Sequence, residues 1–279
     1  MKVVSFSAGD DVIRPGAFIE ESNLVVDLSA AGYSDTLSVI AAGLTSLDTP
    51  GAYPCHRLDA VRLHAPLANP PRLFAIGLNY REHATESGLT LPDYPVVFFK
   101  LQTSIIGPGD AIVLPKNSNE PDWEAELAFV IGKGGFRIKA AEWREHVYGY
   151  TIINDVSARE IQRSTTQWSM SKSFPTFCPM GPAIVTADEI ADPHNLAIGL
   201  SINGEVLQNS RTSQLVFGVP ALVEYLSSIA PLLPGDIIST GTPSGVGMGR
   251  KPPRWLKPGD SVTVTVEGLG ALTNPVVAE

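Results

Sequence analysis

The stretch DWEAELAFVIG (residues 122–132) places acids at every second position, Asp122, Glu124 and Glu126, and then continues into apolar residues. On a β-strand alternate side chains share one face, so the three carboxylates are expected to point the same way. Like charges on one face repel each other, and removing them from water costs still more free energy. Two interpretations follow: an exposed edge strand with solvated acids, or a site for a hard cation such as Mg²⁺, Mn²⁺ or Ca²⁺, which carboxylate oxygens suit.

A further carboxylate comes from INDVSARE (residues 153–160), where Asp155 follows an apolar strand. Arg159 and Gln162 are three positions apart, so on a helix beginning near Val156 their side chains would be neighbours. Asp155 would then lie at the rim of a site, with the positively charged Arg159 four residues further along the chain. The segment is equally consistent with Asp155 as a helix cap and Arg159 in a surface ion pair.

The stretch GLNYREHATE (residues 77–86) contains His83 and Glu86 three positions apart. On one helical turn the carboxylate of Glu86 can orient and polarise the imidazole, as a general base requires. A surface pair is the commoner explanation of such spacing, and the second histidine of the HExxH zinc signature is missing.

Two lysines and a glycine-rich stretch are open to more than one interpretation. Lys172 lies in the aromatic and proline-rich stretch WSMSKSFPTFCPMGP (168–182), and Lys100 ends the strand-like VVFFK. Each lysine is either a surface residue with a buried stem or a cation held in a cleft. The stretch STGTPSGVGMGR (239–250) matches neither the P-loop nor the dinucleotide fingerprint, so we expect a tight loop whose backbone and Thr242 approach a ligand.

Charge and composition narrow the class of protein. The chain has 279 residues and a formal net charge of −9, which argues against a nucleic-acid-binding surface. No apolar run approaches the ~20 residues that a membrane-spanning helix needs, and the first residues lack the apolar region of a signal peptide. Cys55 and Cys178 form no CxxC pattern, which argues against a disulfide framework or a thiolate zinc site. We therefore expect a soluble cytoplasmic protein with reduced thiols.

The chain is expected to divide into two parts. Short apolar runs predict a small N-terminal β-rich module over residues 1–70, and the prolines of residues 64–74 predict an extended connector. The part over 71–279 mixes strands and short helices without regular βαβ alternation. That pattern predicts an α+β fold dominated by mixed and antiparallel sheets.

Individual elements of the second part have recognisable signals. Residues 140–147 predict a short helix, and Asn203-Gly204 between alternating apolar residues predicts a hairpin turn. A further helix is expected to begin at Pro220, because Leu222, Leu226 and Ile229 recur at helical spacing.

Several stretches together resemble the fumarylacetoacetate hydrolase family: IGLNYREHATE, PVVFFK, DWEAELAFVIG, GYTIINDVSARE, KSFPTFCPMGP and GDIISTGTPSGVG. The resemblance covers residues 72–279. It implies mixed β-sheets rolled around a central site with short helices, usually in a homodimer, after a small N-terminal β module. It also implies a bound Mg²⁺ or Mn²⁺, with Ca²⁺ as a structural substitute. The ligands would be Glu124, Glu126 and Asp155, with Asp122 outside the ligand set.

The same resemblance assigns roles to the remaining candidates. The catalytic residues would be His83 and Glu86, as a lid pair, and Lys172. The substrate-binding residues would be Arg159, Gln162 and Thr242, and Lys100 at the end of PVVFFK is assigned to substrate binding with them. Two positions depart from the family pattern. Pro175 replaces an aspartate common in the family and Ser171 a glycine, so the ligand set is intact but the shape of the substrate is open.

These parts predict a metal-dependent hydrolase that cleaves a carbon–carbon bond in a 2,4-dioxo acid of the acylpyruvate or fumarylpyruvate type. His83 would take a proton from the water that attacks the distal carbonyl, and Lys172 would donate to the oxyanion. The same residues could instead decarboxylate oxaloacetate or act as an isomerase or tautomerase of an unsaturated 2-oxo acid. A non-catalytic protein that binds an oxo acid is the remaining alternative.

Overall fold

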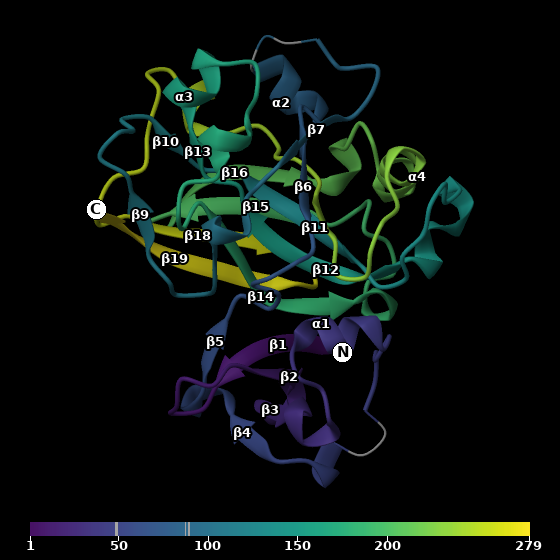
Figure 1. Ribbon diagram of the computed structural model, residues 1–279. Helices are drawn as coiled ribbons and strands as arrows, with labels where there is room; N and C mark the ends of the chain where they lie inside the picture. The colour runs from purple at the N-terminus through teal and green to yellow at the C-terminus, as the bar shows by residue number, and fades with distance from the viewer. Residues whose placement is uncertain (48–49, 87, 89) are drawn as a thin grey trace.

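The structure, a computed structural model, describes residues 1–47, 50–86, 88 and 90–279 of the chain. Its described residues form three β-sheets with short helices around them (Figure 1). The largest sheet has twelve strands, of which β5 (Arg62–His64) pairs with β1 and β8 (Ile105–Ile106) with β14. The other ten follow one another across the sheet in the order β4 (Cys55–Arg57), β3 (Leu24–Asp27), β2 (Arg14–Ile19), β1 (Lys2–Ser7), β14 (Cys178–Thr186), β12 (Val147–Asn154), β11 (Ala125–Ile131), β17 (Ile237–Ser239), β6 (Leu73–Gly77) and β7 (Val96–Phe99).

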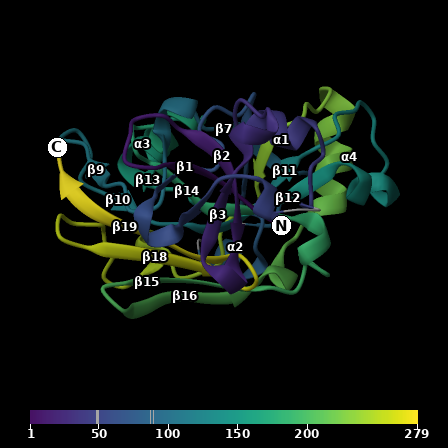
Figure 2. The same cartoon turned by 90° about the horizontal axis from the view of Figure 1, so that it is seen from below.

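A second sheet packs against the central strands of the first. It has five strands in the order β16 (Glu205–Arg211), β15 (Ala197–Ile202), β18 (Ser261–Val266), β19 (Gly270–Ala278) and β9 (Ile112–Leu114). Figure 2 shows β16, β15, β18 and β19 as one layer along an edge of the molecule. The third sheet joins two short strands, β10 (Pro121–Asp122) and β13 (Ser157–Ala158). Parallel pairing joins β17 to β6, β9 to β19 and β8 to β14, and the other described strand pairs are antiparallel, which confirms the α+β prediction.

The helices are short. The α-helices are α1 (Thr36–Ala41), α2 (Arg81–Glu86), α3 (Arg159–Ser164) and α4 (Val219–Ile229). The 3₁₀ segments are Glu20–Ser22, Leu28–Ala31, Pro50–Ala52, Leu58–Ala60, Gln102–Ser104, Ala140–Glu145, Ser169–Lys172, Ala187–Glu189, Thr212–Gln214 and Gly247–Gly249. The helix expected over 140–147 is therefore a 3₁₀ helix of six residues.

The N-terminal strands and α1 lie at one end of the molecule, below the larger part in Figure 1. β1 pairs with β14 in antiparallel register, Lys2 with Val185 and Val3 with Ile184, so the N-terminal sheet continues into the main one. Residues 65–72 form no helix or strand, as a connector requires. A domain boundary near residue 70 stays a prediction.

The acidic stretch is not the single strand that its alternation predicts. Asp122 ends β10, whose partner is β13, and the chain leaves strand geometry at Trp123 and Glu124 before β11 begins. The break accommodates the fully buried indole of Trp123, whose Nε1 donates to the Gly245 carbonyl at 3.1 Å. Asp122 therefore does not share a strand face with the two glutamates.

Strand β11 itself is buried along its whole length, between β12 and β17. Its apolar residues Leu127, Phe129 and Ile131 belong to the largest hydrophobic core of the molecule, together with Trp123. A central strand covered on both faces has no solvated side, which excludes the interpretation of the acids as decoration of an exposed edge strand.

Two other expectations need correction. The helix expected near Val156 begins three residues later, at Arg159, because Ser157 and Ala158 pair with β10 as a strand. Ile229, expected on the buried face of α4, is 66% exposed, because the helix ends there and the next residue is extended.

The other two local predictions are confirmed. Leu222 and Leu226 of α4 are buried, and the helix begins at Val219, one residue before the predicted Pro220, which lies in its first turn. Asn203 and Gly204 join β15 to β16 with positive φ values of 52° and 84°, the backbone that a two-residue type I′ turn requires.

Candidate active site

Three carboxylates meet where β11 begins and β12 ends. The register pairs Ala125 with Asn154 and Glu126 with Ile153, and the backbone N–H of Asp155 donates to the Glu124 carbonyl at 2.9 Å. Asp155 is thereby placed beside Glu124 and Glu126 although it is about thirty residues away in the chain. Oxygens of the three side chains lie within 4.8 Å of one another, and all three residues are buried.

Cations surround two of these carboxylates. Lys172 Nζ donates to Glu124 Oε2 at 2.7 Å and to Asp155 Oδ2 at 2.6 Å. Lys100 Nζ donates to the other oxygen of Asp155 at 2.6 Å, and Arg159 approaches Glu124 Oε1 to 2.7 Å. Although burial opposes ionisation of Glu124, Lys172 and Arg159 outweigh it and lower the pKa of Glu124 to about 2.

Glu126 differs because no basic side chain of the described residues forms an ion pair with it. Its Oε2 accepts hydrogen bonds from Ser239 Oγ at 2.5 Å and from the Gly241 N–H at 2.9 Å. Burial, together with the charges of Asp155 and Glu124, raises the pKa of Glu126 to about 8. Among the three carboxylates, Glu126 is therefore the one least compensated by basic side chains of the described residues.

A divalent cation fits this position. The donor set consists of three carboxylates within one coordination sphere, which is the all-oxygen set that Mg²⁺, Mn²⁺ and Ca²⁺ prefer. Its charge would offset the repulsion that keeps Glu126 protonated. Glu124, Glu126 and Asp155 are therefore the residues that could hold the metal.

Lys172 is held as an ammonium ion. Burial disfavours its charged form, but Asp155 and Glu124 outweigh burial and raise its pKa. Its three N–H groups have partners within the protein, since Ser157 Oγ accepts the third at 2.8 Å. Direct donation to a substrate oxyanion requires Lys172 to give up one of them.

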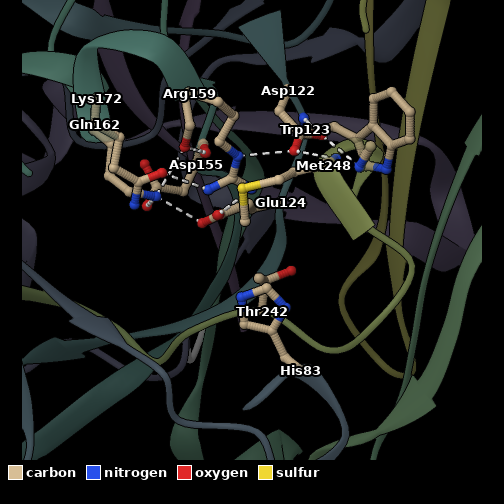
Figure 3. A network of polar contacts seen from close by, with 12 residues as sticks. His83, Asp122, Trp123, Glu124, Asp155, Arg159, Gln162, Lys172, Thr242 and Met248 are labelled. Carbon is tan, nitrogen blue, oxygen red and sulfur yellow. Dashed lines mark hydrogen bonds and ion pairs between the residues drawn. The ribbon is translucent and has the colours of Figure 1, made fainter. Parts of the chain in front are cut away.

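Glu124 and Glu126 line a cavity of about 360 Å³, whereas Asp155 is not part of its wall. Figure 3 shows Glu124 and Asp155 with Lys172 and Arg159 beside them. The volume of the cavity suits a small organic acid. One part of its wall is apolar, formed by Ile76, Phe98, Trp168 and Met248, and another part is polar. The polar part consists of His83, Glu124, Glu126, Arg159, Gln162, Arg163, Lys172 and Thr242.

Helix α2 brings the predicted pair of His83 and Glu86 to the cavity. His83 Nδ1 lies 3.4 Å from Glu86 Oε2, and Glu86 also accepts the Gly245 N–H at 3.0 Å. The carboxylate is therefore fixed between α2 and the glycine-rich loop, and it holds the imidazole by Nδ1. Nε2 of His83 is left as the nitrogen that can exchange a proton with a ligand.

The glycine-rich loop approaches neighbouring parts of the protein closely, and its predicted approach to a ligand stays a prediction. A Cβ at Gly249 would lie 2.4 Å from Glu86 Cδ, and one at Gly247 would lie 2.0 Å from the Arg254 carbonyl. Gly245 has a φ of 101° and a Cβ there would lie 2.1 Å from the Leu207 carbonyl. Larger residues at these positions would displace the loop from the site.

The sequence prediction missed the connecting role of Asp122. Its carboxylate accepts from Arg159 Nε at 2.8 Å and from the backbone N–H groups of Gly247 and Met248 at 2.6 and 3.0 Å. Asp122 thus ties Arg159 to the glycine-rich loop. Asp122 was visible in the sequence as an acid. Its partner Gly247 lies 125 residues away, however, and no local pattern marks the contact between them.

The structure brings most of the predicted site residues together. Arg159 Nη1 donates to Gln162 Oε1 at 2.8 Å, and both line the cavity with Thr242. Lys100 lies behind Asp155 and is not part of the cavity wall. The apolar wall formed by Phe98, Trp168 and Met248 and the buried Gln208 beside Thr242 were not predicted, because nothing distinguishes them from ordinary core residues in the sequence.

Comparison with known proteins agrees with this geometry. Residues 72–277 match the family described as fumarylacetoacetate (FAA) hydrolase, C-terminal. The chain belongs to the fumarylacetoacetate hydrolase family. A family member from Xenopus laevis, named oxaloacetate tautomerase fahd2, mitochondrial, is 43% identical over 294 residues, covering 99% of this chain and 90% of that protein.

Two solved structures have the same fold as this chain. A 5-carboxymethyl-2-hydroxymuconate delta-isomerase from Mycobacterium smegmatis matches with a TM-score of 0.82 and 37% identity, covering all of both chains. The maleylpyruvate hydrolase from Sphingobium sp. SYK-6, solved with manganese(II) ion and pyruvate, matches with a TM-score of 0.84 and 28% identity, covering 100% of this chain and 99% of that one. The predicted mixed-sheet fold of the family is confirmed.

These likenesses change two expectations about this family member. The relatives are enzymes that include a tautomerase and an isomerase as well as a hydrolase, so they favour the isomerase alternative over the predicted carbon–carbon hydrolase. The Xenopus relative is named as mitochondrial, which does not support the predicted cytoplasmic location. Among the described residues, no helix is long and apolar enough to cross a membrane.

Proposed function

We propose that the chain is a divalent-metal-dependent isomerase of 2-oxo acids that interconverts the keto and enol forms of oxaloacetate. The observation that carries the choice of reaction is the likeness to an oxaloacetate tautomerase over 99% of the chain at 43% identity. The similar delta-isomerase supports the broader class, in which a proton moves along a carbon skeleton without cleavage.

The metal would be held by Glu124, Glu126 and Asp155. When bound, Mg²⁺ or Mn²⁺ would supply Lewis acidity toward the 2-oxo group of the substrate. The residues around the carboxylates keep them in place: Lys100 and Lys172 fix the two oxygens of Asp155, and Ser239 fixes one oxygen of Glu126. We assign Lys100 to this positioning role because it lies outside the cavity wall.

His83 is proposed as the residue that transfers the proton. Tautomerisation breaks a C–H bond at C3 of the 2-oxo acid and forms an O–H bond at the oxygen on C2, so it needs a base that can also return a proton. Glu86 lies at Nδ1 and so orients the imidazole, which leaves Nε2 as the nitrogen proposed to exchange the proton. The Gly245 N–H, 3.0 Å from Glu86, keeps that carboxylate from turning away.

Substrate charge is matched by the polar part of the cavity. Arg159 and Gln162 are hydrogen bonded to each other and line the cavity, so they are proposed to bind the C4 carboxylate of oxaloacetate. Thr242 is proposed to donate to the C1 carboxylate, which pyruvate also has. Lys172 would act through its charge, because its N–H groups already have partners. The apolar wall of Phe98 and Trp168 would exclude water from the C3 atom.

Carbon–carbon hydrolysis of an acylpyruvate-type substrate is a second candidate. It is favoured by the likeness to a maleylpyruvate hydrolase solved with pyruvate, at a TM-score of 0.84. The pair of His83 and Glu86 could activate a water as readily as it could take a proton from carbon. Because the same site residues could serve both reactions, only the products distinguish them.

A panel of substrates tests the choice. Purified protein with Mg²⁺ is mixed with enol-oxaloacetate, and ketonisation is followed by the loss of ultraviolet absorbance, with EDTA as control. Acetylpyruvate, fumarylpyruvate and oxaloacetate are incubated in parallel and the products are identified by NMR. We expect metal-dependent ketonisation without release of pyruvate. Pyruvate formation from acetylpyruvate or fumarylpyruvate, with no acceleration of ketonisation, would establish the hydrolase instead.

We further propose that the enzyme is a homodimer. Phe99, Leu101 and Met170 are 47%, 49% and 68% exposed, an apolar set of a kind that subunit contacts usually bury. They lie on two segments joined by the hydrogen bond from the Phe99 N–H to Ser169 Oγ. Light scattering after gel filtration measures the mass in solution, and a mass of about 30 kDa, that of the 29.7 kDa chain, would contradict the dimer.

A further inference from the structure

Gln208 joins three segments around the candidate site. It lies on β16 and is 1% exposed. Its Oε1 accepts from the Ala125 N–H at 2.9 Å, and its Nε2 donates to Thr242 Oγ1 and to the Pro243 carbonyl, both at 2.9 Å. One amide group therefore connects the start of β11 to the glycine-rich loop.

The partners fix the orientation of this amide. The Ala125 N–H can only donate and the Pro243 carbonyl can only accept, so the oxygen of Gln208 must face the first and the nitrogen the second. Thr242 consequently receives an N–H at its hydroxyl oxygen. The hydroxyl hydrogen of Thr242 must then point elsewhere, and Thr242 lines the cavity.

We infer that Gln208 is a positioning residue that presents the Thr242 hydroxyl as a hydrogen-bond donor to an ionised carboxylate of the bound 2-oxo acid. This inference rests on the proposed function, which supplies the 2-oxo acid. A carboxylate has only acceptor oxygens, so it complements a hydroxyl whose hydrogen is free.

Gln208 also contacts the backbone between two of the candidate metal ligands, since Ala125 lies between Glu124 and Glu126. A substitution could therefore act through the metal site instead of through Thr242. The two routes are separated by measuring metal binding and anion binding independently. If Gln208 acts through Thr242, a substitution of Gln208 should weaken anion binding and leave metal binding unchanged.

The experiment uses isothermal titration calorimetry of Mn²⁺, and then of pyruvate at saturating Mn²⁺, on wild type, Gln208→Met, Thr242→Val and the double variant. We expect the Mn²⁺ Kd to stay within about twofold of wild type and the pyruvate Kd to rise about tenfold in each single variant, the loss of one hydrogen bond to a charged group. The double variant should bind pyruvate no more weakly than Thr242→Val alone, because both changes remove the same bond. In both single variants the KM for enol-oxaloacetate should rise by a larger factor than kcat falls.

Two further variants test whether the effect comes from the N–H that Gln208 donates to Thr242. Gln208→Glu keeps an acceptor for the Ala125 N–H but withdraws the donor from Thr242, so it should weaken pyruvate binding in the same way. Gln102→Met is the matched control, because the Gln102 amide donates to the Pro70 carbonyl and is not part of the cavity wall. It should leave both dissociation constants unchanged.

Each outcome has one meaning. Unchanged pyruvate binding in Gln208→Met, or independent losses that multiply in the double variant, overturns the inference while leaving the proposed function intact. Loss of Mn²⁺ binding in Gln208→Met and Gln208→Glu overturns it in favour of a role at the metal site. If wild type with Mn²⁺ accelerates the ketonisation of enol-oxaloacetate but binds no pyruvate, the carboxylate subsite at Thr242 is wrong and the inference is overturned. If it neither binds pyruvate nor accelerates ketonisation, the proposed function itself is wrong and the inference falls with it.

Discussion

Asp122 and Arg159 form a buried ion pair in which Arg159 Nε donates to Asp122 Oδ2 at 2.8 Å, and neither side chain is more than 1% exposed. The same carboxylate accepts the N–H groups of Gly247 and Met248 from the glycine-rich loop. Asp122 therefore holds Arg159, which lines the cavity, against the glycine-rich loop, and it is not one of the three candidate metal ligands.

Asp122→Asn is expected to destabilise the protein by about 3–5 kcal/mol, because it leaves a buried guanidinium with one partner fewer and turns an NH₂ group toward backbone donors. Activity at saturating metal should fall because the loop and Arg159 lose their common anchor. Denaturant unfolding and steady-state kinetics measure the two effects. Asp59→Asn is the matched control: it breaks the exposed Arg57–Asp59 pair, and its unfolding midpoint should stay near that of wild type. Equal effects of the two substitutions would contradict the anchoring role.

Glu126→Gln tests the metal site by removing the carboxylate that lacks an ion pair among the described residues. The variant should keep the stability of the metal-free protein, since an amide can occupy the position without a buried charge, but Mg²⁺ should no longer raise its Tm. Thermal unfolding with Mg²⁺ and with EDTA compares the two proteins. Glu205→Gln, at an exposed pair with Arg254, should behave as wild type. A wild-type Tm that does not respond to Mg²⁺ or Mn²⁺ would count against the site.

The raised pKa of Glu126 also predicts a pH dependence. Folding raises this pKa from 4.5 to about 8, so its contribution to the stability of the metal-free protein is present at low pH and is lost as the pH rises through 8. A metal binds the ionised carboxylate, so below pH 8 binding must release the proton. The Mn²⁺ Kd should therefore fall as the pH increases from 6 to 8 and then level off. Calorimetry in buffers of different ionisation enthalpy counts the released proton, and a Kd independent of pH over this range would refute the assignment.

The sequence predicted the chemistry of the site better than its geometry. Glu124, Glu126 and Asp155 are marked by their position beside apolar strands, and β11 and β12 bring them together. The alternation of the three acids nevertheless suggested one strand, because periodicity does not reveal that Trp123 interrupts it to enter the core. A local pattern cannot register a break that tertiary packing imposes.

The remaining differences have the same origin. Lys172 was visible as a lysine in an apolar stretch, but the saturation of its N–H groups depends on Ser157 and on acids from other strands. Gln208 carries no motif at all, and its partners come from β11 and from the loop after β17. Long-range hydrogen bonds of this kind follow from the fold and leave no spacing in the sequence.

The pair of His83 and Glu86 allows the sharpest test of the proposed proton transfer. His83→Gln should lower kcat for enol-oxaloacetate by about 10²–10⁴-fold, because it removes the group that exchanges the proton. Glu86→Gln should have a smaller effect, since the imidazole remains but loses the carboxylate that fixes Nδ1 and is held by the Gly245 N–H. The Mn²⁺ Kd, measured by calorimetry, should stay unchanged in both variants because neither residue belongs to the ligand set. Full ketonisation by His83→Gln, with metal binding intact, would assign the proton transfer to another residue of the cavity.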